Sequence, residues 1–162
     1  MGQPKLKVER ARVDDLVPYV GNAKMHPAEQ VDQIAASIER FGFSDPVGVW
    51  TNPDGALEIV EGHGRVMAAK LLGIDEVPVI RLDHLDDDAR RAYVHVHNQI
   101  TLSSGFDLGT LAAELDSIQG FEWEDFGLGS MSSVSFDGPA EFKEFGEDIE
   151  TSNKCPKCGF EW

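Results

Sequence analysis

The stretch IVEGHGRVMAAKLLG, residues 59–73, largely determines how this chain can fold. It begins with β-branched residues typical of a strand and continues with alanines and leucines typical of a helix. Between them lies the turn Gly62-His63-Gly64-Arg65, which places backbone N–H groups at the start of the helix. Such a helix terminus attracts anions, and the guanidinium of Arg65 suits a phosphate group. The turn therefore predicts a phosphate site, with His63 as a candidate acid or base. In the alternative interpretation, the glycines only form a turn and Arg65 pairs with an acidic side chain.

The hydrophobic spacing on both sides of this turn predicts an α+β domain in which helices pack on a small mixed sheet. A short strand is expected near residues 6–8. Further strands are expected at 46–50, 56–60 and 77–82, and the turn sequence NPDG joins the first two of these in a hairpin. Helices are expected at residues 28–41, at 64–72, from about residue 86 and from residue 107. The segment FEWEDFGLG after the last helix is expected to pack back as a closing turn.

The apolar spacing in the last two expected helices assigns a buried face to each. In the helix from about residue 86, this face is expected to hold Ala89, Ala92, Tyr93, Val96 and Ile100. In the helix that follows the expected N-cap Asp107, it is expected to hold Leu108, Leu111, Ala112, Leu115 and Ile118. Arg90 and Arg91 are expected on a solvated helix face. They could form a local basic patch with Lys5, Lys7, Arg10 and Arg12.

The composition changes at about residue 130, where small polar and acidic residues with scattered phenylalanines replace the periodic pattern. The chain is therefore divided into a folded domain at 1–129, a flexible acidic linker at 130–153 and a Cys-x-x-Cys tail at 154–162. The net charge of −15 opposes non-specific binding to DNA. No apolar run is long enough to cross a membrane, and the first residues do not form a secretory signal, so a cytoplasmic protein without membrane contact is expected.

The tail holds the only cysteines, Cys155 and Cys158, whose spacing is typical of a zinc knuckle. A closed structural zinc site needs four ligands, and the tail supplies two. The others could come from a second subunit, from a partner protein, or from His26 or His84. In the alternative interpretation, the pair is a truncated motif with free thiols.

The order and spacing of the segments at 22–50, 58–85 and 91–115 resemble the ParB/sulfiredoxin-like superfamily. The chain is most similar to a branch of phage and prophage proteins often described as ParB-like nuclease domain proteins, which are frequently fused to or encoded near DNA methyltransferases. The resemblance extends over about residues 6–128, so it covers most of the chain. It implies the ParB N-terminal/sulfiredoxin-like fold.

In chromosome-partitioning ParB proteins, the turn that matches Gly62-His63-Gly64-Arg65 reads Gly-Glu-Arg-Arg and contacts CTP. Gly62 and Arg65 match this motif, whereas His63 and Gly64 replace its glutamate and its first arginine. The resemblance therefore implies a phosphate ligand, a nucleoside triphosphate such as CTP or ATP with magnesium, without securing CTP in particular. Sulfiredoxins carry a catalytic cysteine in this turn, where this chain has His63, so sulfiredoxin activity is not expected.

Two further family elements add residues to the expected nucleotide site. An element that reads Glu-Asn followed by a basic residue corresponds to His97 and Asn98, and the first loop of the family corresponds to the loop that holds Asn22. The family glutamate is replaced by His97 and no arginine follows, so hydrolysis of the nucleotide is not expected. The histidines of HVHNQ are not expected to form a nuclease metal site, because His95 and His97 do not share a helical face.

Together these features imply a nucleotide-binding, DNA-associated accessory protein of phage type in a bacterial host cell. DNA is expected to be contacted directly or through a partner, such as a DNA methyltransferase or another phage protein, and a homodimer is also expected. One alternative is a metal-dependent nuclease, or a phosphotransferase that uses His63 as acid or base. The other is an acidic protein-interaction adaptor without ligand chemistry.

Overall fold

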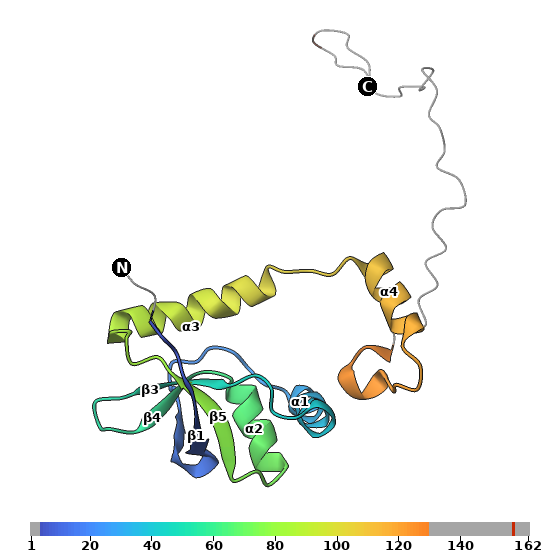
Figure 1. Ribbon diagram of the computed structural model, residues 1–162. Helices are drawn as coiled ribbons and strands as arrows, with labels where there is room; N and C mark the ends of the chain where they lie inside the picture. Colours follow the sequence, from blue (N-terminus) through green and yellow to red (C-terminus); the bar gives the residue numbers. More distant parts are fainter. Residues whose placement is uncertain (1–3, 130–156, 158–162) are drawn as a thin grey trace.

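The computed structural model describes residues 4–129 and Lys157, in which helices pack on both faces of a five-stranded sheet (Figure 1). The strand order is β1-β5-β3-β4-β2, with β1/β5 and β3/β4 antiparallel and β5/β3 and β4/β2 parallel. The strands are β1 (Val8–Arg12), β2 (Leu16–Pro18), β3 (Val47–Thr51), β4 (Leu57–Glu61) and β5 (Glu76–Arg81). The helices are α1 (Ala28–Phe41), α2 (His63–Leu71), α3 (Asp87–Leu102) and α4 (Leu108–Ser117), with 3-10 turns η1 (Val13–Asp15) and η2 (Glu124–Phe126). The expected α+β class with a small mixed sheet is confirmed.

The main core lies between the sheet and α2. It consists of β-branched residues from the three central strands, all nearly inaccessible to solvent: Val47, Val49, Ile59, Val77 and Val79. Each such side chain stabilises the fold by roughly 1.5–3 kcal/mol when it leaves water. Helix α1 lies outside α2, where the small side chain of Ala68 allows close contact with Val31 and Ala35. The core therefore fixes α2, and with it the glycine turn at its start.

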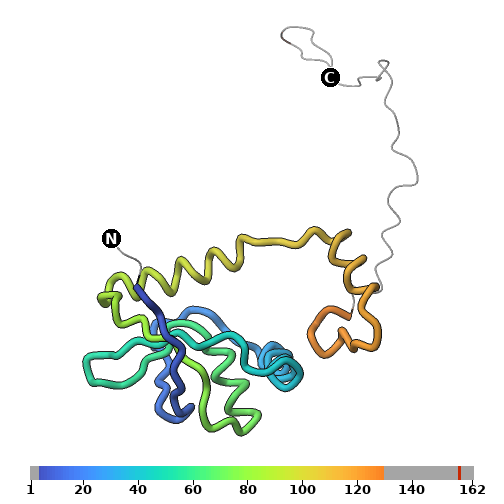
Figure 2. The backbone as a smooth tube through the Cα atoms, viewed as in Figure 1, coloured from blue at the N-terminus to red at the C-terminus, as the bar shows by residue number. Residues whose placement is uncertain are grey.

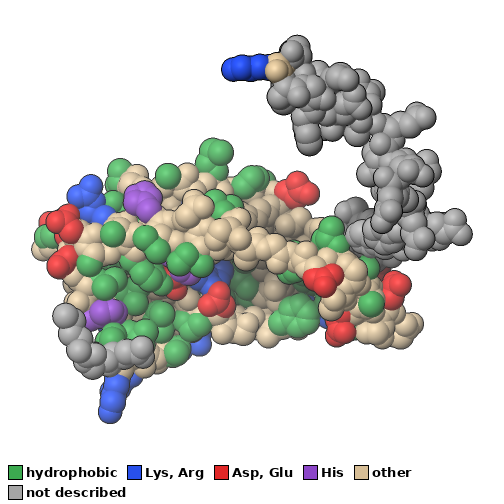
Figure 3. Space-filling view, turned by 90° about the horizontal axis from the view of Figure 1, so that it is seen from above, with side chains coloured by type: hydrophobic (Ala, Val, Ile, Leu, Met, Phe, Trp, Pro, Cys, Tyr) green, Lys and Arg blue, Asp and Glu red, His purple; other side chains and the backbone are tan. Residues whose placement is uncertain are grey.

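Helix α3 covers the other face of the sheet with a different side from the one expected. Val94 is 2% exposed and packs on Val60, but Val96 and Ile100, which were expected inside, are 54% and 64% exposed. Polar side chains of α3 also face the domain: Arg90 is buried, and His97 lies beside Glu61 of β4. The expected buried face is therefore right for Tyr93, which is partly buried and packs in the cluster of Val60 and Val94, and wrong for its other members, which are exposed. Helix α3 is held by polar contacts as well as by apolar packing. In Figure 3, seen from the side of α3, hydrophobic side chains lie on the surface.

Arg90 is buried, at 4% exposure, so its expected place on a solvated helix face is wrong. Its guanidinium lies between the rings of Tyr19 and Trp50, 4.4 and 4.6 Å from their centroids. It also forms ion pairs of 2.7 Å with Glu58 of β4 and with Asp87. Burial by itself would lower the pKa of Arg90, but the hydrogen bond that Arg90 donates to Asp87 and the charge of Glu58 outweigh it and raise that pKa. This cluster joins α3 to β3, to β4 and to the loop after β2.

An extended segment leads from α3 to α4, and the turn η2 that follows α4 contacts α1 (Figure 2). Asp107 caps α4 by accepting a hydrogen bond from the Thr110 N–H, as predicted. Of the expected inner face of α4, Leu115 is buried, whereas Leu108 and Ile118 are 46% and 41% exposed. The segment after α4 packs back on α1 as predicted. The ring of Phe121 stacks on that of Phe41, and the ring of Phe126 is tilted against it.

The basic residues of β1 do not form a free patch with Arg90. Arg10 pairs with Glu76 at 3.2 Å, and Arg12 lies 3.8 Å from Asp14. The expected linker at 130–153 and the tail cysteines Cys155 and Cys158 lie outside the described residues, so both remain predictions. In the described part of the chain, none of the helices has the length and apolar character needed to span a membrane.

Candidate phosphate-binding site

The turn between β4 and α2 requires glycine at two positions for different reasons. Gly62, the N-cap of α2, has φ 91° and ψ 23°, a left-handed conformation that other residues rarely adopt. Gly64 has no positive φ, but a Cβ there would lie 2.9 Å from Ile34 Cδ1 and 3.0 Å from His26 Nδ1. Gly64 is therefore needed for space: without a side chain there, the start of α2 can lie close to Ile34 of α1 and to His26.

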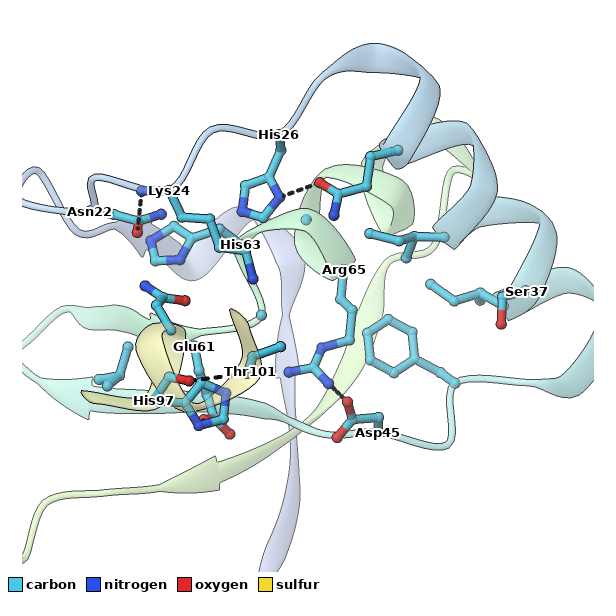
Figure 4. A pocket seen from close by; sticks show the side chains of 18 of the residues that line it. Asn22, Lys24, His26, Ser37, Asp45, Glu61, His63, Arg65, His97 and Thr101 are labelled. Carbon is cyan, nitrogen blue, oxygen red and sulfur yellow. Dashed lines mark hydrogen bonds and ion pairs between the residues drawn. The ribbon is translucent and has the colours of Figure 1, made fainter. Parts of the chain in front are cut away.

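The first turn of α2 opens into a cavity of about 480 Å³ between α1, the loop after β2 and the end of α3 (Figure 4). The structure brings every residue of the predicted nucleotide site to its wall: Asn22, Gly62, His63, Gly64, Arg65, His97 and Asn98. His95, two residues from His97, is exposed and does not line the cavity. The size is within the range of small-molecule sites. That these residues bind a ligand remains a prediction.

His63 is neutral in this environment. Burial, together with the nearby His26, lowers the pKa of His63 to about 4. Its Nε2 accepts a hydrogen bond of 3.3 Å from the backbone N–H of Tyr19, which leaves the ring proton on Nδ1. His63 can therefore donate a hydrogen bond to a ligand, but it is a poor general acid near neutral pH.

Arg65 turns its guanidinium back over the glycine turn. A Cβ at Gly62 would lie 2.9 Å from both Nε and Nη2 of Arg65, so only glycine leaves room for this arrangement. The Arg65 side chain is only 18% exposed, and burial lowers its pKa. It forms an ion pair with Asp45, whose side chain is 75% exposed. The alternative expected from the sequence, that Arg65 pairs with an acidic residue, is thus also present.

Glu61 forms a second polar centre at the cavity wall. Its Oε2 accepts a hydrogen bond of 2.9 Å from the Tyr93 hydroxyl and lies 3.4 Å from His97 Nδ1. Burial and the adjacent Glu61 raise the pKa of Tyr93 to about 12. A Cβ at Gly48 would lie 2.5 Å from Glu61 Cγ, so glycine in β3 leaves room for this carboxylate. His97 therefore contributes to the cavity as the partner of an acid.

The sequence prediction missed several polar residues of the cavity. They come from the loop after β2, from α1, from the loop before β3 and from α3: Lys24, His26, Gln30, Ser37, Ser44, Asp45 and Thr101. The signal that could have found Lys24 and His26 is their place in the same loop as Asn22. Asp45 had no such signal. Within residues 4–129 and Lys157, no group of three or more His, Cys, Asp or Glu side chains is placed to hold a metal ion.

The fold is that of a small α+β domain with a cavity at a strand-to-helix turn. Residues 3–98 match the family of the ParB N-terminal domain, and the chain belongs to this family. It is 45% identical over 87 residues to the ParB-like nuclease domain-containing protein YnaK of Escherichia coli K12, a match that covers 54% of this chain and 95% of that protein. The superfamily resemblance seen in the sequence is confirmed.

Two chromosome-partitioning proteins are also similar. The chain is 40% identical over 52 residues to the probable ParB of Treponema pallidum, covering 32% of this chain and 16% of that protein. Its fold is similar to the crystal structure of C-terminally truncated ParB from Caulobacter crescentus complexed with CTP-γ-S. The TM-score is 0.63 and the identity 21%, with 77% of this chain and 71% of that chain covered. The similarity to the Caulobacter structure shows that the two proteins share a fold.

Proposed function

We propose that the protein binds a nucleotide, and that the first turn of α2 holds its phosphates. The observation that carries this proposal is the placement of Arg65 and of the α2 N-terminus in one cavity. The first hydrogen bond of the helix runs from the Val66 N–H to the Gly62 carbonyl, so the N–H groups before Val66 have no partner within the helix. Together with the helix dipole and the guanidinium, they suit a phosphate group.

A nucleoside triphosphate, CTP or ATP with magnesium, is the ligand that the family relationship supports. The Caulobacter ParB with the same fold was crystallised with CTP-γ-S. Two carboxylates, Asp45 and Glu61, face the cavity beside the cations Lys24 and Arg65. A magnesium ion would reduce the repulsion between these carboxylates and a triphosphate.

We expect binding without hydrolysis. His63 is neutral and accepts a hydrogen bond at Nε2, so it does not supply an acidic proton near neutral pH. His97, which stands where the family has a glutamate, is engaged with Glu61. A phosphotransferase or a metal-dependent nuclease on the same fold would instead need a proton-transfer group or a metal at this position.

The proposal extends to an accessory role near DNA, in a bacterial host and of phage type. The family relationship supports this role, whereas the net charge of −15 and the ion-paired arginines of β1 favour contact through a partner protein. That partner would be a DNA methyltransferase or another phage protein, and homodimer formation is part of the same proposal. Any zinc at Cys155 and Cys158 would belong to such an assembly.

The test is isothermal titration calorimetry with CTP, ATP and GTP in magnesium buffer. At least one nucleotide is expected to bind the wild type, and Arg65→Ala is expected to weaken binding at least about tenfold, because a charged hydrogen bond contributes roughly 1.5–3 kcal/mol. Arg91→Ala, which removes an exposed arginine outside the cavity, is the control. Failure of every nucleotide to bind, both to the wild type and to a variant without the Asp45 carboxylate, Asp45→Asn, would refute the proposal. Phosphate release and nicking of supercoiled plasmid, each measured on the same samples, would reveal hydrolysis or nuclease activity.

A further inference from the structure

Asp45 holds the guanidinium that the proposed phosphate site depends on. It lies in the loop between α1 and β3, and its carboxylate pairs with Nη1 of Arg65 (Figure 4). The two side chains differ in environment, because that of Arg65 is 18% exposed and that of Asp45 is 75% exposed. The arginine is thus fixed in the cavity wall, and its partner reaches it from solvent.

A phosphate bound at the α2 N-terminus would meet the same guanidinium. The guanidinium of Arg65 lies over Gly62. Its Nε and Nη2 atoms are 2.9 Å from where a Cβ of residue 62 would be, so the guanidinium already covers the turn where the phosphate would bind. A carboxylate on Nη1 uses part of the donor set that a bidentate phosphate contact needs. It also places a negative charge beside the incoming phosphate, which raises the free energy of the bound state.

Release of Asp45 is easy on structural grounds. Its carboxylate is mostly in water already, so it loses little solvation when it forms or breaks the pair. Arg65 cannot leave as readily, because α2 is fixed in the core and its guanidinium is confined by the turn. The Asp45 carboxylate is therefore the member of the pair that moves.

We propose that Asp45 is a built-in competitor of the ligand, which occupies Arg65 in the free protein and must leave before a phosphate can bind fully. This inference rests on the proposed nucleotide site, and it adds that Asp45 lowers the affinity of that site for the nucleotide. If Arg65 is free in about a tenth to a third of the molecules, the apparent Kd is raised about three- to tenfold over that of an unoccupied site. The loop that carries Asp45 would then change its contacts when the nucleotide binds.

The test compares nucleotide binding by the wild type and Asp45→Asn, with CTP and magnesium and with ATP and magnesium, by calorimetry. Asp45→Asn keeps the size of the side chain and is expected to bind about three- to tenfold more tightly. Asp54→Asn removes the same charge from the exposed turn between β3 and β4 and is the matched control, expected to bind like the wild type. Arg65→Ala is expected to abolish the gain from Asp45→Asn, because the competition acts through the guanidinium.

The outcomes separate this inference from the proposed function. If the wild type binds and Asp45→Asn binds equally or more weakly, Asp45 is not a competitor, although the nucleotide site stands. A gain that persists in the Arg65→Ala background, or that appears equally in Asp54→Asn, reflects general electrostatics and also overturns the inference. Binding by Asp45→Asn alone supports both the site and a strong form of the competition. If neither protein binds either nucleotide, both the site and the inference are refuted.

Discussion

Replacement of Arg90 by alanine should destabilise the domain strongly, although the side chain lies outside the proposed site. The Arg90 side chain is 5% exposed and pairs with Glu58, whose side chain is 15% exposed. Removal of one member of a buried ion pair leaves the other charge buried without its partner, at about 3–5 kcal/mol. The contacts with the two flanking rings, those of Tyr19 and Trp50, add to this loss.

The neighbouring residue provides the control, because Arg91→Ala makes the same change one position along the same helix. The Arg91 side chain is 57% exposed and lies 3.8 Å from Asp88, so its loss should change the free energy of unfolding by no more than about 0.5 kcal/mol. In urea denaturation followed by tryptophan fluorescence, Arg90→Ala should lower the midpoint by at least about 1 M. The double variant Glu58→Leu/Arg90→Met should recover most of the lost stability, because apolar residues can replace a buried pair.

The reasoning on Arg90 would be refuted by similar midpoints for Arg90→Ala and Arg91→Ala. That result would mean that Arg90 is not enclosed between the two rings, and that α3 does not turn its polar side toward the sheet. A failure of the double variant to recover stability would locate the loss in the ring contacts instead of the unpaired Glu58.

The two other predictions concern groups with shifted pKa values. Because His63 has a pKa of about 4 in the folded state and about 6.5 when unfolded, it stabilises the domain fully above pH 6.5, and this contribution is lost as the pH falls toward 4. Between pH 8 and pH 5 the loss should be about 1–2 kcal/mol. In urea denaturation, His63→Gln should show a smaller loss of stability on the acid side, and an equal loss in the wild type and in this variant would contradict the assignment. Tyr93, with its pKa raised to about 12, should ionise last in a titration of tyrosinate absorbance. Tyr93→Phe should remove that late transition, and persistence of the transition in this variant would show that it arises elsewhere.

The elements of the fold could be predicted from the sequence because their signals are local. The bounds expected for α1 were found unchanged, as was the Asp107 cap, since helical spacing and capping depend on residues a few positions apart. The short strand β2 was missed, because three residues give too little periodicity for a prediction. The inner face of α3 was predicted correctly at Tyr93 and wrongly elsewhere, because the inner side is determined by partners far along the chain, such as Glu58 for Arg90.

The site was predicted in part, for a similar reason. The glycine turn is a continuous motif, and the resemblance to a family supplied the residues that lie far from it, among them His97 and Asn22. Asp45 and Glu61 could not be assigned, because their roles come from contacts with Arg65 and Tyr93 across the fold. An acidic residue in a loop has no sequence feature that distinguishes a partner of a buried arginine from an ordinary surface charge.

The most direct measurement is the change in backbone amide chemical shifts of ¹⁵N-labelled protein on addition of CTP or ATP with magnesium. If the first turn of α2 holds the phosphates, the N–H signals of His63, Gly64 and Arg65 should shift most, and those of the distant turn at residues 52–55 should stay in place. Arg65→Ala should remove these shifts. Saturable shifts confined to another part of the chain, or none at millimolar nucleotide, would contradict the proposed phosphate site.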